Sequence, residues 1–172
     1  MLEAAILVVF PFAMAHVAIS DMLSMTIANR VSLLLIGSFA ILAPLTGMPL
    51  YVLGMHAFAM IVVLAVCFGF FAMGVMGGGD AKLLAATALW LGFSAELMNY
   101  LLLASILGGA LTLAILNYRG SSMAVLTGRV GFLARIADAK EKIPYGIALG
   151  AAGLIIFPDT EMAQWVLQRL AT

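Results

Sequence analysis

Uncharged apolar segments alternate with short charged stretches along the chain. The uncharged runs are residues 4–20, 31–79, 83–95, 97–118 and 143–158. A helix that crosses the hydrocarbon core of a bilayer needs about 20 predominantly apolar residues, so the run 31–79 is long enough for two spans. The stretch APLTGMPLY at 43–51 contains two prolines and a glycine, which predicts a turn between those spans.

This pattern predicts six helices. Their expected ranges are 4–20, 31–46, 50–76, 82–96, 97–118 and 143–158. The fourth is short for a crossing, unless Lys82 extends along its apolar stem to one interface and Glu96 lies at the other. Hydrophobic residues make up 65% of the chain and charged residues 9%, with a mean hydropathy of +1.19, which excludes an ordinary soluble domain. We therefore predict an all-α integral membrane protein, a single domain over 1–172 built as a bundle of about six transmembrane helices.

The basic residues indicate how this bundle is oriented. With the N-terminus outside, seven of the eight Lys and Arg residues fall on the cytoplasmic side, and only Arg169 falls outside. The seven are Arg30, Lys82, Arg119, Arg129, Arg135, Lys140 and Lys142. Cytoplasmic loops carry an excess of Lys and Arg, so we predict a multi-pass protein with a periplasmic N-terminus. The formal net charge is zero, which indicates no nucleic-acid partner.

The segment 119–142 is the one sizeable polar connection, between the fifth and sixth helices. On a helical wheel its charged residues share one face, opposite an apolar face. The charged face holds Arg135, Asp138, Glu141 and Lys142, and the apolar face holds Val130, Leu133, Ile136 and Ala137. This pattern predicts an amphipathic cytoplasmic helix lying on the inner leaflet, with a solvated loop as the alternative.

Two aspartates stand at the cytoplasmic ends of predicted spans. Asp21 closes the first span and Asp80 closes the third, so the predicted topology places both at the same depth. An ionisable group at the hydrocarbon edge costs about 3 kcal/mol, which makes each a candidate functional group. Two close carboxylates share a proton and titrate as a unit. One can then activate a water that attacks an amide, while the protonated partner polarises the carbonyl.

Three glycines precede the second aspartate in the stretch GVMGGGDAKLLAA at 74–86. Gly77, Gly78 and Gly79 remove side chains beside Asp80 and permit backbone angles closed to other residues. An extended substrate could then approach the carboxylate closely. The alternative is that the glycines only break a helix at the interface.

No metal site or cofactor is predicted. Cys67 is the only cysteine, which excludes a multi-cysteine zinc site within one chain. His16 and His56 lie in apolar spans without a partner at metal-ligand spacing, and we interpret both as packing residues.

Three separated stretches resemble one known family. They are SDMLSMTIANRVSLLL at 20–35, MGGGDAKLLAA at 76–86 and KIPYGIALGAAG at 142–153. Over nearly its whole length the chain resembles the type IV prepilin peptidases, and more narrowly the small members that serve tight-adherence (Flp) pili. The resemblance implies a bundle of about six helices in the bacterial inner membrane, with two catalytic aspartates facing the cytoplasm.

The family's motifs carry over to individual positions of this chain. Asp21 matches the aspartate after the first helix, and Gly77, Gly79 and Asp80 match the Gly-x-Gly-Asp motif. The residues that match the remaining motifs are Lys82, which continues that motif, Asn29 of an Ile-Pro-Asn stretch, and Pro144, Tyr145 and Gly146 of an Ile-Pro-Tyr-Gly stretch. Ala28 departs from the pattern because it replaces the proline of Ile-Pro-Asn, which leaves the shape of the first cytoplasmic turn open.

The resemblance implies an aspartic endopeptidase that removes the leader from a prepilin or pseudopilin at the cytoplasmic edge of the membrane, after a glycine in most substrates. Its partners are then the substrate helix and the lipid bilayer, with the pilus assembly machinery as a further candidate. The cytoplasmic insert and cysteine tetrad of larger members are missing, which implies a peptidase without methylase activity. The residues alone also allow a small proton-coupled transporter using the same carboxylates, although transporters place such groups nearer the midplane. A presenilin-like protease would carry Pro-Ala-Leu near the C-terminus, where this chain has IPYG.

Overall fold

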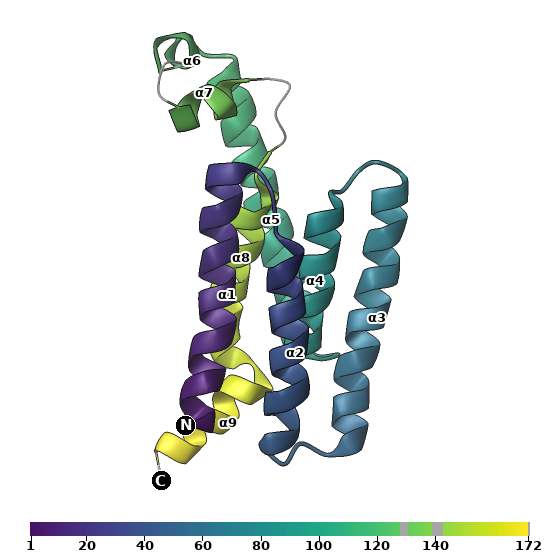
Figure 1. Ribbon diagram of the computed structural model, residues 1–172. Coiled ribbons are helices and arrows are strands. Elements are labelled where there is room, and N and C mark those ends of the chain that lie inside the picture. Colours follow the sequence, from purple (N-terminus) through teal and green to yellow (C-terminus); the bar gives the residue numbers. More distant parts are fainter. Residues whose placement is uncertain (128–130, 139–142, 172) are drawn as a thin grey trace.

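A computed structural model describes residues 1–127, 131–138 and 143–171 (Figure 1). Within these ranges the chain is helical and contains no strand. The elements are α1 (Leu2–Ser24), α2 (Asn29–Leu45), α3 (Leu50–Ala72), α4 (Gly78–Leu91), α5 (Ala95–Arg119), α6 (Ser122–Thr127), α7 (Gly131–Ala137), α8 (Tyr145–Ile156), η1 (Phe157–Asp159) and α9 (Glu161–Leu170).

Three helices, α1, α3 and α5, are long and apolar enough to cross a membrane. The segment from α8 through α9 is bent by 47° and makes a fourth if it counts as one span, and α2 is a shorter apolar helix of 17 residues. Length and composition therefore confirm an all-α membrane protein.

Each of the six predicted helices has a counterpart, but the end of the third helix and both ends of the fourth are wrong. The third helix ends at Ala72 and the fourth begins at Gly78, because Gly74 turns the chain with a φ of +73°, an angle that favours glycine. The fourth ends at Leu91, where Gly92 has a φ of +72°. Turns built on positive-φ glycines therefore replace the helix ends that the hydropathy pattern predicted.

The short helix α4 lies at the centre of the bundle. Ala81 and every residue from Leu83 to Leu91 are buried, and α4 packs against α3, α2 and α8. Trp90 fixes it to α2 because its Nε1 donates a hydrogen bond to the Leu35 carbonyl at 2.8 Å. Since protein surrounds α4, its length need not match the thickness of the bilayer.

Small residues bring α8 close to its two long neighbours. A Cβ on Gly150 would lie 2.5 Å from the backbone oxygen of Met14 in α1. A Cβ on Gly108 in α5 would lie 2.9 Å from the ring of Tyr145. Such close approach is the usual basis of helix association in membranes, and it places α8 between α1 and α5.

The connections divide between the two ends of the bundle (Figure 1). The α1–α2 and α3–α4 turns and the helices α6 and α7 lie at one end, whereas both termini and α9 lie at the other. The prediction of one amphipathic helix over 119–142 is wrong, because α5 runs to Arg119 and the two short helices α6 and α7 follow it. The predictions for Arg129, Val130, Lys140, Glu141 and Lys142 lie outside the described residues.

Candidate active site

Asp21 lies in the last turn of α1, since the helix continues to Ser24. Its side chain is buried, with an exposed fraction of 4%. The backbone N–H of Gly146, the second residue of α8, donates a hydrogen bond of 2.6 Å to Asp21 Oδ2. That N–H is among the first four of its helix, which lack a partner inside the helix. The Asp21 carboxylate therefore gives the Gly146 N–H, at the start of α8, the hydrogen-bond acceptor that the helix itself does not supply.

Glycine at position 146 allows this contact. A Cβ there would lie 2.7 Å from Asp21 Cβ and 2.8 Å from Asp21 Oδ2. Pro144 immediately precedes the helix, as its N-cap residue, where a missing N–H costs nothing. The Ile-Pro-Tyr-Gly stretch thus starts α8 where its backbone can reach α1.

Asp80 lies in the first turn of α4 and is half-buried. The prediction that it closes the third span is wrong, because the turn at Gly74 ends α3 before it. A carboxylate is favourable in the first turn of a helix. Asp80 borders a cavity of about 630 Å³. The other lining residues are Phe70, Gly74, Val75, Met76, Gly77, Leu84, Arg119, Ile143, Tyr145 and Leu149.

The glycines before Asp80 allow close packing and do not adopt unusual backbone angles. A Cβ on Gly77 would lie 2.7 Å from Asp80 Oδ2, and one on Gly79 would lie 3.2 Å from Ile27 Cβ. Neither has a positive φ; the described positive-φ glycines lie at 47, 74 and 92. Gly77 therefore lies directly beside the carboxylate, Gly79 lies against Ile27, and the predicted unusual backbone angle is wrong at both positions.

Lys82 and Asn29 join the first turn of α4 to the start of α2. Lys82 Nζ donates a hydrogen bond of 3.0 Å to Asn29 Oδ1. Ala28, the N-cap residue of α2, has a φ of −70° and a ψ of 131°. Proline fixes φ near this value. The turn thus keeps the shape that proline would impose, although alanine occupies the position.

Adjacent residues at the start of α8 connect the surroundings of the two aspartates. Tyr145 lines the cavity beside Asp80, while Gly146 binds Asp21. The Tyr145 hydroxyl forms a hydrogen bond of 3.0 Å with Thr112 Oγ1 in α5. Arg119 also lines the cavity; the sequence identified it only as a cytoplasmic charge, because nothing in its local pattern indicates a pocket.

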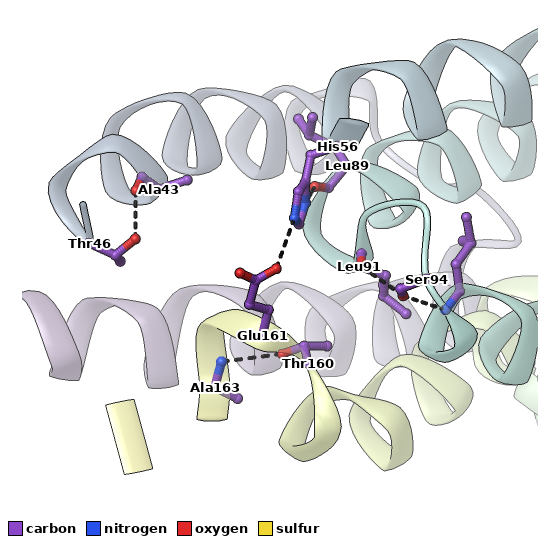
Figure 2. A network of polar contacts seen from close by, with 10 residues as sticks. Ala43, Thr46, His56, Leu89, Leu91, Ser94, Thr160, Glu161 and Ala163 are labelled. Atoms are coloured by element: carbon purple, nitrogen blue, oxygen red, sulfur yellow. Dashed lines mark hydrogen bonds and ion pairs between the residues drawn. The ribbon is translucent and has the colours of Figure 1, made fainter. Parts of the chain in front are cut away.

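The two histidines lie at different depths: His16 precedes Asp21 by five residues in α1, whereas His56 lies near the start of α3, toward the other end of the bundle. His16 is exposed and stacks on Phe12, with ring centroids 6.3 Å apart. His56 is buried, and its Nδ1 lies 2.7 Å from the Leu89 carbonyl oxygen. Figure 2 shows Glu161 extending from α9 toward His56, with 3.8 Å between Oε2 and Nε2. For His56, the predicted packing role is confirmed.

Comparison with known proteins places the chain in a family. The model of the type IV leader peptidase family matches residues 8–113, a range that includes Asp21, Asn29, Asp80 and Lys82. No curated protein and no solved structure matches the chain. Because the matched range is more than half of the sequence, the chain belongs to the type IV leader peptidase family.

Proposed function

We propose that this protein is an aspartic endopeptidase that removes the leader of a prepilin-like substrate, with Asp21 and Asp80 as its catalytic pair. Family membership supports peptidase activity on a leader sequence. The observation that carries the assignment of residues is the start of α8, where Gly146 binds Asp21 and the neighbouring Tyr145 borders the cavity of Asp80. The transporter alternative has no comparable support.

The proposed reaction needs one ionised and one protonated carboxyl group. One carboxylate takes a proton from a water molecule, and the oxygen of that water attacks the carbonyl carbon of the scissile bond. The other donates a hydrogen bond to the carbonyl oxygen, which takes up the developing negative charge. The tetrahedral intermediate collapses as the C–N bond breaks and the protonated carboxyl group gives its proton to the leaving nitrogen, while its partner keeps the proton taken from water. This chemistry requires neither a covalent enzyme intermediate nor a cofactor.

The proposed topology has six spans, α1 to α5 and α8, with the N-terminus in the periplasm of a bacterial inner membrane. The bias of basic residues supports it. In Figure 1, the turns beside Asp21 and Asp80 lie at the end that carries α6 and α7, and this end would face the cytoplasm. A leader that remains in the cytoplasm could then reach both carboxylates.

The proposed substrate has a basic leader ending in glycine, followed directly by an apolar helix. Pilins of the tight-adherence type and pseudopilins have this form, and the pilus assembly machinery would receive the product. Cleavage at the cytoplasmic edge suits such a chain, because its polar and apolar parts meet there.

Replacing the aspartates tests the proposal. Asp21→Asn and Asp80→Asn should each reduce cleavage of a co-expressed precursor of this form by about 10³-fold or more, since either change removes half of the acid–base pair. Asp159→Asn should leave cleavage unchanged, because this exposed carboxylate ends η1 directly before α9, and α9 lies at the opposite end of the bundle. Membrane levels of the protein must be equal in all variants. Cleavage retained at the normal rate in either active-site variant would refute the catalytic pair.

A further inference from the structure

A second cavity, of about 420 Å³, lies between α3 and α5. One face of each helix lines it. The α3 residues are Ala59, Val62, Val63, Val66, Cys67 and Phe70, and the α5 residues are Leu97, Met98, Leu101, Ala104 and Ser105. Leu84 of α4 and Leu149 of α8 also border it. The hydroxyl of Ser105 is satisfied by the Leu101 carbonyl at 2.7 Å, so the lining is apolar almost throughout.

The cavity is an open groove in the side of the bundle. Helix α3 packs along α4, and α5 packs along α8, but no extensive packing joins α3 to α5, which are both described in full. Ala104 is 6% exposed, whereas Val66 and Met98 are each 55% exposed. The groove therefore has a buried floor and a mouth that faces the surroundings of the bundle.

The groove is continuous with the cavity that contains Asp80. Five residues line both: Phe70, Met76, Leu84, Tyr145 and Leu149. The first cavity is bordered by the charged residues Asp80 and Arg119, whereas the groove is bordered almost only by apolar side chains. A chain that passes from the cavity into the groove therefore moves from polar to apolar surroundings. The polarity thus changes at the point where the two cavities meet.

The geometry points to this groove as the docking site for the apolar helix of the substrate, on the side of the scissile bond that stays in the membrane. This inference rests on the proposed peptidase function. From Ala59 to Phe70, the lining face of α3 rises about 16 Å, or three helical turns. The groove is too small to enclose a helix about 10 Å wide. A substrate helix that runs along the mouth of the groove could insert into it the side chains of one face, spaced at i, i+3, i+4 and i+7.

Cross-linking can locate the substrate helix. The probe is a model precursor with a basic leader ending in glycine and an apolar helix of about 20 residues, carrying one cysteine at successive positions of its first three turns. The enzyme carries Cys67→Ala and Asp80→Asn, which remove the native thiol and prevent cleavage. A single cysteine then replaces Val66 or Met98 at the groove. Matched controls replace Phe68 or Leu102, which lie outside the lining, on the same helices, and are 62% and 63% exposed.

We expect oxidation to join the precursor to Val66→Cys and Met98→Cys at least about fivefold more than to the control positions, with a helical period along the precursor. Equal cross-linking at groove and control positions would mean that lipid fills the groove and the substrate collides at random, which overturns the inference. Cross-linking confined to the control positions, or none at any position, overturns it as well.

Kinetics separate this inference from the proposed function. In the otherwise native enzyme, Val66→Trp should raise the KM for the precursor about tenfold with little change in kcat, because it fills the groove without touching the aspartates. Leu64→Trp, on the same helix but outside the lining, should change neither. An unchanged KM in Val66→Trp, with normal cleavage, would overturn the docking site and leave the peptidase proposal standing. Specific cross-linking in the groove without any cleavage by the native enzyme would overturn the peptidase proposal and leave the docking site standing.

Discussion

Gly146 and Asp21 lie 125 positions apart in the sequence, and a hydrogen bond of 2.6 Å joins the amide of one to Oδ2 of the other. The bond holds a buried carboxylate at the junction of α1 and α8. A buried carboxylate needs such partners, because burial without them is costly. The glycine therefore acts through its backbone N–H and through the side chain it lacks.

Gly146→Ala should reduce kcat by about 100-fold with little change in KM, because the new methyl group displaces Asp21 by a fraction of an ångström or more. The measurement is steady-state cleavage of a precursor by purified enzyme. Gly150→Ala is the matched control. It forces the same two helices apart at Met14, so it should lower the melting temperature but reduce kcat far less. Equal losses of kcat in both variants would show that Gly146 only supports packing.

Gly79→Val should reduce kcat/KM by about 100-fold, because its side chain would strike Ile27 and displace the first turn of α4 that carries Asp80. Gly78→Met should reduce kcat/KM less than about tenfold. The nearest neighbour of position 78 is the ring of Phe71, which is 48% exposed and can change rotamer at modest cost. Similar rates in the two variants, at similar membrane levels, would contradict this account of the glycines.

Ala28→Pro should preserve cleavage and stabilise the protein by about 0.4–1 kcal/mol, because the φ of −70° already suits proline and the unfolded chain loses freedom. The N–H of Ala28 forms no hydrogen bond within the described residues, so none is lost. Thermal unfolding in detergent measures the change. Asn29→Ala, one position later, serves as the comparison: it removes the side chain that binds Lys82 without restricting the unfolded chain, so it should not stabilise the protein.

Thiol labelling should reveal the orientation. In a Cys67→Ala background, single cysteines at Leu50 and Asp159 should react with an impermeant reagent added to the periplasm, whereas one at Ser122 should react only after the inner membrane is opened. All three native side chains are exposed, and Ser122 belongs to α6 at the end opposite α9. Labelling in the reverse pattern would place the aspartates on the wrong side for a cytoplasmic leader.

The sequence by itself determined that α1 to α5 and α8 are helices, and it determined the candidate residues. Uncharged runs and the Pro-Gly turn at 43–51 are local signals, and α2 and α3 meet where they predict. Motifs of a few residues singled out Asp21 and Asp80 for the same reason. Such patterns can be recognised in the sequence because each depends only on residues that are close together along the chain.

The tertiary structure alone decided which distant groups meet. Nothing in the local pattern indicates that the amide of Gly146 binds Asp21, that Arg119 borders the cavity of Asp80, or that α3 and α5 leave a groove between them. The sequence also placed Asp80 at the end of the third helix instead of the start of the fourth. Hydropathy does not reveal that Gly74 adopts a positive φ and ends the third helix there. The contacts between distant groups depend on how α8 and α4 pack against their neighbours, whereas the turn at Gly74 depends on a backbone angle that glycine permits.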